Sequence, residues 1–303
     1  MSAPSILVTG AEGQLARALM QVANATTNSE LSVAAIGRLV LDITNPETLT
    51  AAMEQYQPAL VVNCAAYTGV DQAETEEGRA FAVNAEGAAA LAEKCQLGGI
   101  PMIHVSTDFV FPGTLERPYI ETDATGPVNA YGLSKLEGEK CITAVCPRHI
   151  ILRTSWVYSP WGSNFVRTML RLARERKEIS VVADQQGCPT YAPHLATAIM
   201  EITSQILSSK NAKAPWGIYH AAGSGETSWC GFAQQIFSES ARHGGPTARV
   251  VPISTEQYPT PARRPANSRL DCTKLKARFG IELPHWSDGT AKCVAHLLSS
   301  QSE

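Results

Sequence analysis

The chain has 303 residues, a length that suits either one large α/β domain or two modest domains. Its 25 Lys and Arg residues, against 28 Asp and Glu residues, give a net charge of −3. This balance lacks the general basic field that gathers nucleic acid, so no nucleic-acid partner is expected. A hydrophobic content of 44% with 17% charged residues excludes a disordered chain and predicts a folded globule.

The eight cysteines include no Cys-x-x-Cys pair and are too sparse for a disulfide-rich scaffold. They indicate a reducing compartment. The first residues lack the basic flank and long apolar run of a signal peptide. No apolar stretch approaches the roughly 20 residues of a membrane span. We therefore expect a soluble, cytoplasmic protein with no membrane partner.

The first half of the chain alternates short apolar runs with longer helical patterns, which is typical of βαβ units. Apolar, β-branched strands of this kind suit a parallel sheet that is buried on both faces. The pattern predicts an α/β fold, a Rossmann-type doubly wound parallel sheet with a smaller α/β domain. The predicted strands are Ile6–Thr9, Ser32–Ile36, Leu60–Asn63, Met102–Ser106 and Ile150–Arg153, and the predicted helices are Gln14–Ala23, Pro46–Gln55, Glu77–Gln96, Asn129–Val145 and Asn164–Arg176.

Two glycines follow the first predicted strand and open the first predicted helix. Gly10 and Gly13 permit a tight turn in which backbone N–H groups approach a diphosphate at the positive end of the helix. Ala16 is small enough for the helix to pack closely on the strand. Since Gly-x-x-Gly is common in ordinary turns, its position at the start of a βαβ series is what indicates a dinucleotide site.

The second predicted strand runs into Gly37 and Arg38, where dinucleotide-binding folds often carry an acidic residue for the ribose 2′-hydroxyl. Gly37 removes a carboxylate that would repel a 2′-phosphate, and Arg38 supplies a cation that could pair with it. This pattern favours NADPH and leaves NADH open. The alternative is an ordinary surface arginine. Asp42 either faces the adenine or serves as a loop or capping residue.

A Tyr-x-x-x-Lys pair lies on the fourth predicted helix, with Tyr131 and Lys135 one turn apart on the same face. A free phenol has a pKa of about 10, so a nearby ammonium is needed before it can exchange protons near neutrality. Thr107 follows the fourth predicted strand, at the sheet edge where doubly wound folds bind ligands. Its hydroxyl can hydrogen-bond a substrate carbonyl while hydride arrives from a nicotinamide. These three residues predict carbonyl reduction.

Together, these motifs strongly resemble the extended short-chain dehydrogenase/reductases, and among them the dTDP-4-dehydrorhamnose reductases, over nearly the whole chain. The matching segments are GAEGQL (10–15), LDIT (41–44), VNCAAYTGVD (62–71), STDFVF (106–111), NAYGLSKLEGE (129–139), RTSWVY (153–158), DQQGCPT (184–190) and RP (264–265). The resemblance implies reduction of the 4-keto group of dTDP-4-dehydro-β-L-rhamnose to dTDP-β-L-rhamnose with NADPH, the last step in making that activated sugar.

The resemblance also implies the roles of individual residues. Tyr131 would donate the proton. Lys135 would activate Tyr131 and hold the nicotinamide ribose, and Thr107 would bind the substrate oxygen. The implied cofactor-binding residues are Gly10, Gly13, Gln14, Leu15, Arg38, Asp42, Ile43, Ala66, Tyr67, Thr68, Val105, Tyr131 and Lys135. The implied substrate-binding residues are Val70, Thr107, Asp108, Tyr131, Trp156 and Arg264.

Three of these positions keep an alternative interpretation. Trp156 offers an indole face for a deoxysugar but could equally be a core residue. Arg264 suits a diphosphate, because a guanidinium matches phosphate oxygens, but could lie in a solvated turn. Asn164, which is outside the implied set, either caps the following helix or contacts the nucleotide.

Two departures from some members of the family shape further expectations. Some relatives carry an acidic residue where this chain has Gly37, and they accept NADH. Some place glutamates for a Mg²⁺ between two subunits, where this chain has Ala18 and Pro193. Neither side chain ligates a cation. We therefore expect no metal, and a monomer or weak homodimer.

The motifs also suggest how the chain divides into domains. We expect residues 1–156 to form the NADP(H)-binding domain, which the chain revisits near 186–212. Residues 157–303 would form most of a discontinuous substrate-binding domain. Two other functions remain open, a nucleotide-sugar epimerase or dehydratase with tightly bound NAD, and a nonenzymatic regulatory subunit of the same fold.

Overall fold

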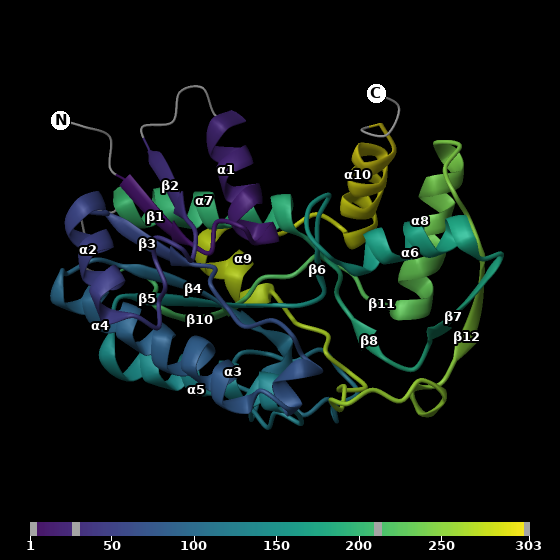
Figure 1. Cartoon of the computed structure of the whole chain (residues 1–303), viewed down its shortest axis with the longest axis horizontal. Coiled ribbons are helices and arrows are strands. Elements are labelled where there is room, and N and C mark those ends of the chain that lie inside the picture. Colours follow the sequence, from purple (N-terminus) through teal and green to yellow (C-terminus); the bar gives the residue numbers. More distant parts are fainter. Residues whose placement is uncertain (1–4, 26–30, 209–213, 300–303) are drawn as a thin grey trace.

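The computed structural model describes residues 5–25, 31–208 and 214–299, and a six-stranded parallel sheet lies at its centre (Figure 1). The strand order is β2-β1-β3-β4-β5-β10, so the chain moves outward from β1 in both directions. This doubly wound arrangement confirms the predicted fold class. The strands are β1 (Ser5–Thr9), β2 (Ser32–Ile36), β3 (Leu60–Asn63), β4 (Met102–Thr107), β5 (His149–Thr154) and β10 (Gly217–His220).

Helices cover both faces of this sheet (Figure 1). Alternate residues of each strand enter one of two apolar cores, since successive side chains of a strand point to opposite faces. Ile6 and Val8 of β1 face the helices α1 and α7, whereas Leu7 faces α2, α4 and α5. The helices of the two faces are α1 (Gln14–Ala25), α7 (Ala192–Ser208) and α9 (Thr273–Phe279) on the first, and α2 (Pro46–Tyr56), α3 (Glu77–Phe81), α4 (Ala88–Leu97) and α5 (Ala130–Val145) on the second.

Asparagine side chains cap the starts of three helices. Asn45 accepts a hydrogen bond from the Glu47 amide, and Pro46 occupies the first helical position. Asn129 caps α5 in the same way. Asn164 caps α6 (Phe165–Glu175), which supports the capping role considered for it from the sequence. The predicted helices therefore began one residue too early at Asn129 and Asn164, because an N-cap residue has extended rather than helical backbone angles.

The predicted helix 77–96 is not regular. Between α3 and α4 lies a π-helical segment, Ala82–Gly87, which inserts a wider turn into the helix. This segment buries Asn84, a polar residue with 1% of its surface exposed. The apolar pattern of the sequence did not predict the irregularity, which places an amide beside the loop that follows β3.

A smaller lobe lies beside the sheet and has its own apolar core (Figure 1). Phe232 and Ile236 of α8 and Val294 of α10 are at its centre. Strands β7 and β12 pair in parallel although about seventy residues separate them in the chain. Its elements are α6, β7 (Glu178–Val182), α8 (Trp229–Arg242), β12 (Arg249–Ile253) and α10 (Trp286–Ser299).

The chain returns to the main sheet after entering the smaller lobe. Helix α7 packs against α1, and β10 extends the sheet beside β5. Among the described residues, no helix combines the length and apolar character needed to cross a membrane. The connecting strands are β6 (Val157–Tyr158), β8 (Gln186–Gly187), β9 (Thr190–Tyr191) and β11 (Thr227–Ser228), with short 3-10 segments at Gln72–Glu74, Asp108–Val110 and Thr255–Gln257.

Candidate active site

The glycine turn between β1 and α1 brings two backbone segments into close contact. Gly10 has a φ of +75°, and a Cβ atom there would lie 3.1 Å from the Ala65 backbone. The Gly13 amide donates to the Gly10 carbonyl oxygen over 2.9 Å, which closes the turn at the start of α1. A turn this tight leaves the helix N-terminus open to a phosphate group, so these residues fit a dinucleotide.

The two residues that follow Gly13 have different roles. Leu15 is 8% exposed and packs in the core below α1, so its side chain is not available to a cofactor. Only its backbone can take the contact expected from the sequence. The Gln14 side-chain oxygen accepts hydrogen bonds from Ser159 and Asn164, each over 2.9 Å. Gln14 therefore joins the phosphate-binding turn to the segment before α6.

The turn after β2 carries the residues expected to choose between NADPH and NADH. Arg38 Nε donates to Asp42 Oδ2 over 2.9 Å, and the arginine side chain is 61% exposed. Although burial raises the pKa of the Asp42 carboxyl, hydrogen bonds from Thr44 and Arg38 bring it below its usual value. The Glu12 carboxylate lies over Gly37, so closely that a Cβ atom at Gly37 would be 1.9 Å from its Oε1.

Ile43, also expected to bind the cofactor, follows Asp42 in the same turn. Its side chain is 3% exposed and contacts the core between the sheet and α4. Any contact with a cofactor is limited to its backbone.

The loop after β3 contains Ala66, Tyr67 and Thr68, and the π-helical segment holds it in place. The Tyr67 amide donates to Asn84 Oδ1 over 2.8 Å, and Asn84 Nδ2 donates to the Tyr67 carbonyl over 3.0 Å. Asn84 Nδ2 also lies 3.0 Å from Ser134 Oγ on α5. A buried amide therefore fixes the backbone of the loop expected to line the cofactor.

Tyr131, Thr107 and Asp108 meet at the carboxyl edge of β4. Thr107 Oγ1 donates to Asp108 Oδ1 over 2.9 Å. Burial raises the pKa of Tyr131 to about 12, an effect that the Thr107 hydroxyl opposes. Burial likewise raises the pKa of Asp108 to about 7, against the influence of the Ser268 and Thr107 hydroxyls. Near neutrality Tyr131 is therefore a phenol, with a proton to give.

Lys135 reaches the sheet one helical turn below Tyr131. Its Nζ donates to the Val105 carbonyl over 2.8 Å and lies 3.2 Å from His104 Nε2. The side chain is 2% exposed. Burial lowers the pKa of Lys135 to about 8, although Glu139 and Cys64 oppose the shift. Val105, expected to bind the cofactor, meets Lys135 through its carbonyl oxygen.

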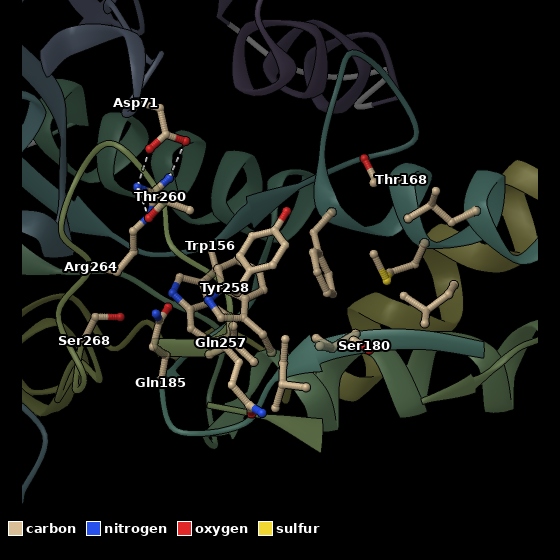
Figure 2. Close-up of a pocket in the computed structure, with 18 of the residues that line it drawn as sticks. Asp71, Trp156, Thr168, Ser180, Gln185, Gln257, Tyr258, Thr260, Arg264 and Ser268 are labelled. Carbon is tan, nitrogen blue, oxygen red and sulfur yellow. Dashed lines mark hydrogen bonds and ion pairs between the residues drawn. The ribbon is translucent and has the colours of Figure 1, made fainter. Parts of the chain in front are cut away.

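A cavity of about 850 Å³ is lined by residues from both halves of the chain and extends into the smaller lobe (Figure 2). Asp71, Trp156 and Arg264 line it. So does Phe109, whose ring meets Tyr131 edge-on at 5.9 Å between centroids. The cavity thus runs from Phe109, which packs against Tyr131, to the Trp156 indole.

Trp156 has one face covered within this cavity. Its ring stacks on Trp229 with 3.6 Å between centroids and an interplanar angle of 6°. Its backbone is left-handed, with a φ of +48°, a conformation that costs energy for a bulky residue. A Cβ at Gly187 would strike the same ring, so glycine is required there. The indole is therefore neither free nor fully in the core, and it lines the cavity from a fixed position.

No group of three or more potential metal-ligating side chains gathers anywhere in residues 5–25, 31–208 and 214–299. Ala18 of α1 is one of the two positions where some relatives carry glutamate. Its side chain is completely buried in the core between α1 and the sheet.

Comparison with known proteins decides the family. The family model of the RmlD substrate binding domain matches residues 4–299. A dTDP-4-dehydrorhamnose reductase from Sinorhizobium fredii is 48% identical over 293 residues, which is 97% of each chain. This chain belongs to the dTDP-4-dehydrorhamnose reductase family. A relative of that name from Burkholderia thailandensis is 45% identical over 305 residues, covering 97% of this chain and 99% of its own.

Solved structures in the family have the same architecture. The crystal structure of dTDP-4-dehydrorhamnose reductase from Bacillus anthracis in complex with NADP is 35% identical, with a TM-score of 0.88. The match covers 97% of this chain and 99% of that one. The family resemblance inferred from the motifs is thereby confirmed over nearly the full length.

Sequence reasoning missed several polar residues that organise this family member's site. Asn84, Asn63 and His104 are each at most 1% exposed, and all make side-chain hydrogen bonds near the motif residues. One signal was available for two of them, because Asn63 ends an apolar strand and His104 interrupts the apolar run at the start of β4. A polar residue in such a strand requires a partner, although the sequence does not name it.

Proposed function

We propose that this protein reduces the 4-keto group of dTDP-4-dehydro-β-L-rhamnose to give dTDP-β-L-rhamnose, with NADPH as the reductant. The observation that carries the proposal is the half-buried Tyr131 phenol, whose ring packs edge-on against Phe109, a residue that lines a cavity large enough for a nucleotide sugar. The family to which the chain belongs supports the choice of substrate.

The proposed chemistry gives each catalytic residue a defined role. NADPH, when bound, would supply the hydride that adds to C4 of the sugar. Tyr131 gives its phenolic proton to the C4 oxygen, and its raised pKa keeps that proton available near neutrality. The Thr107 hydroxyl orients the same oxygen. Lys135, one helical turn from Tyr131, holds the nicotinamide ribose and stabilises the phenolate that remains.

We also propose where the cofactor and the substrate lie. The diphosphate of NADPH binds at Gly10 and Gly13, its 2′-phosphate meets Arg38, and Ala66–Thr68 line its nicotinamide half. The sugar lies among Val70, Thr107, Asp108 and Trp156, and Arg264 faces the substrate diphosphate. The cofactor domain comprises residues 1–156 with the returning segment near 186–212, and most of 157–303 binds the substrate.

We propose that this activity takes place in the cytoplasm. All eight cysteines are free, as expected for a protein kept in a reducing cytoplasm. We propose that the protein acts there as a monomer or weak homodimer, without a metal and without nucleic acid.

The state of the bound dinucleotide tests this function against an epimerase or dehydratase. A reductase must release oxidised cofactor after each turnover, so the purified protein should lose its dinucleotide on dialysis and bind added NADPH reversibly. Chromatography of the nucleotides released by denaturation measures this directly. A stoichiometric NAD that survives dialysis would contradict the proposal, since it would indicate an enzyme that returns its hydride.

A further inference from the structure

The first turn of α5, which carries Tyr131, is held by contacts with three other segments. A Cβ atom at Gly132 would strike the backbone that follows β4, so the helix packs directly on that segment. The Ala130 amide donates to Glu74 Oε1 over 2.8 Å. Asn129, the N-cap residue, makes the third contact and is 7% exposed. The backbone of the proposed proton donor thus depends on segments that are distant in the sequence.

Both ends of the Asn129 amide are hydrogen-bonded, and these bonds determine its orientation. Oδ1 accepts from the Gly132 amide over 2.8 Å, which caps the helix. Nδ2 donates to the Arg263 carbonyl over 2.8 Å, across 134 residues of sequence. A flipped amide would set an NH₂ group against the Gly132 N–H and an oxygen against the Arg263 oxygen, so both contacts would be repulsive. One side chain therefore joins α5 to the loop of residues 260–265.

The carbonyl that Asn129 binds belongs to the peptide bond that leads into Arg264. Fixing this oxygen fixes the plane of the peptide, because the peptide unit is rigid. Pro265 follows Arg264, and a residue before proline is restricted to extended backbone. The Asp71 carboxylate binds the guanidinium at the other end of the side chain. Arg264 is therefore held through its backbone by Asn129 and through its side chain by Asp71.

These contacts close into a ring, because Asp71 and Glu74 belong to the same short segment. Asp71 precedes the 3-10 helix Gln72–Glu74, and Glu74 is its last residue. Glu74 binds the first turn of α5. Asn129 joins that turn to the 260–265 loop, from which Arg264 leads back to Asp71. Arg264 and the first turn of α5 cannot move apart without breaking one of these hydrogen bonds.

A fixed separation of this kind suits a nucleotide sugar. Its diphosphate is attached at C1 of the pyranose, and C4 lies across the same ring. An enzyme that binds the diphosphate and protonates the C4 oxygen must keep the two binding groups at a matching distance. We propose that Asn129 is a positioning residue that sets this distance by joining the backbone of Arg264 to the helix of Tyr131. The inference rests on the proposed reductase function and adds the residue that brings C4 to the proton donor.

Asn129→Asp separates the cap from the link to the loop. Aspartate caps helices as well as asparagine does, so the first turn of α5 should remain formed. A carboxylate cannot donate to the Arg263 carbonyl, so the link is lost. We expect kcat with saturating NADPH and dTDP-4-dehydrorhamnose to fall by about tenfold, with the Kd values for dTDP and NADPH changed by less than about twofold. Binding survives because Asp71 still holds the Arg264 guanidinium.

A second variant keeps the test decisive if the new carboxylate disturbs the loop. Asn129→Ser also retains a good cap but is uncharged and too short to bind both partners, so it should show the same fall in kcat. Asn45→Asp is the matched control, because Asn45 caps α2 and does not line the cavity. Its kcat should equal that of the wild type. Wild-type kcat in both Asn129 variants, or an equal fall in Asn45→Asp, would overturn the proposal.

Hydrogen exchange of the ligand-free protein, followed by NMR, tests the link without any substrate. The Ala262 amide donates to Asp71 and so reports on the 260–265 loop, whereas the Gly132 amide reports on the cap. In Asn129→Asp we expect exchange at Ala262 to be about fivefold faster or more and exchange at Gly132 to be unchanged. Unchanged exchange at Ala262 would overturn the proposal. A wild-type protein that failed to oxidise NADPH would refute the proposed function, but the exchange rates would still measure the link.

Discussion

The Arg264 guanidinium forms two hydrogen bonds with the Asp71 carboxylate, at 2.5 and 2.8 Å, across 193 residues of sequence (Figure 2). Asp71 follows β3, and Arg264 lies in the segment that connects the smaller lobe back to the sheet. The Ala262 amide donates to the same carboxylate. Arg264 is expected to contact the substrate diphosphate. Asp71, from the half of the chain expected to bind the dinucleotide, therefore holds it at the cavity wall. Arg264 lowers the pKa of that acid.

Arg264→Lys tests whether this orientation matters for the substrate. Lysine keeps the charge but cannot bind both carboxylate oxygens in one plane and still present a further donor. We expect the KM for the nucleotide sugar to rise by about tenfold, which is about 1.4 kcal/mol, with the Kd for NADPH unchanged. Steady-state kinetics and a cofactor titration measure the two constants. The neighbouring, exposed Arg263→Lys is the matched control, and an equal effect there would refute a specific role for Arg264.

Arg38→Ala tests the proposed contact with the 2′-phosphate. The Nε of Arg38 already donates to Asp42, so we expect the two terminal nitrogens of Arg38 to bind the phosphate. The KM for NADPH should rise by tenfold or more while that for NADH changes little, because only NADPH carries the 2′-phosphate. Arg171→Ala provides the control, since Arg171 is equally exposed and also pairs with an acid four residues on. Equal changes for both cofactors would show that Arg38 does not recognise the phosphate.

Asp108→Asn should change how stability depends on pH. The folded-state pKa of Asp108 is about 7, above the usual aspartate value of about 4, so the folded protein binds more protons between these two values. Protonated Asp108 therefore contributes to the free energy of unfolding of the wild type at low pH. This contribution is lost as the pH rises from about 4 towards 7.

Asparagine at position 108 cannot ionise, so the substitution removes this loss. Relative to the wild type, Asp108→Asn should gain about 1–3 kcal/mol of unfolding free energy between pH 5 and pH 8. Urea denaturation at the two pH values measures the difference. A constant offset between the two proteins would mean that Asp108 is already ionised at pH 5.

Tyr131→Phe separates proton donation from cofactor binding. The substitution removes the phenolic proton but keeps the ring that meets Phe109 edge-on. Turnover should fall by about 100-fold or more, as for the loss of a general acid, while NADPH binds with nearly the wild-type Kd. Stopped assays and fluorescence titration supply the two quantities. Turnover at the wild-type rate would exclude Tyr131 as the proton donor.

The parts of this structure that depend on local pattern could be predicted from the sequence. The five strands expected in the first half are present, each within one residue of its predicted ends. Their continuous apolar runs identify them as strands, because a parallel sheet buries both of its faces. The glycine turn was equally readable, since only glycine tolerates the backbone of Gly10.

Relationships between distant residues could not be predicted in this way. Nothing local to Asp71 shows that Arg264 is its partner, and the stacking of Trp156 on Trp229 depends on how the smaller lobe packs. Helix α5 shows the same limit. Its Tyr131 and Lys135 followed from their spacing, but the contact between Lys135 and His104 depends on how the helix lies across β4.

The most direct test is NADPH consumption by the wild-type protein with dTDP-4-dehydrorhamnose generated in place, alongside the UDP analogue. The proposed function predicts stoichiometric oxidation of NADPH with formation of dTDP-rhamnose, and slower reaction of the UDP sugar. Absence of NADPH oxidation with the dTDP sugar, by a folded protein that binds NADPH, would contradict it.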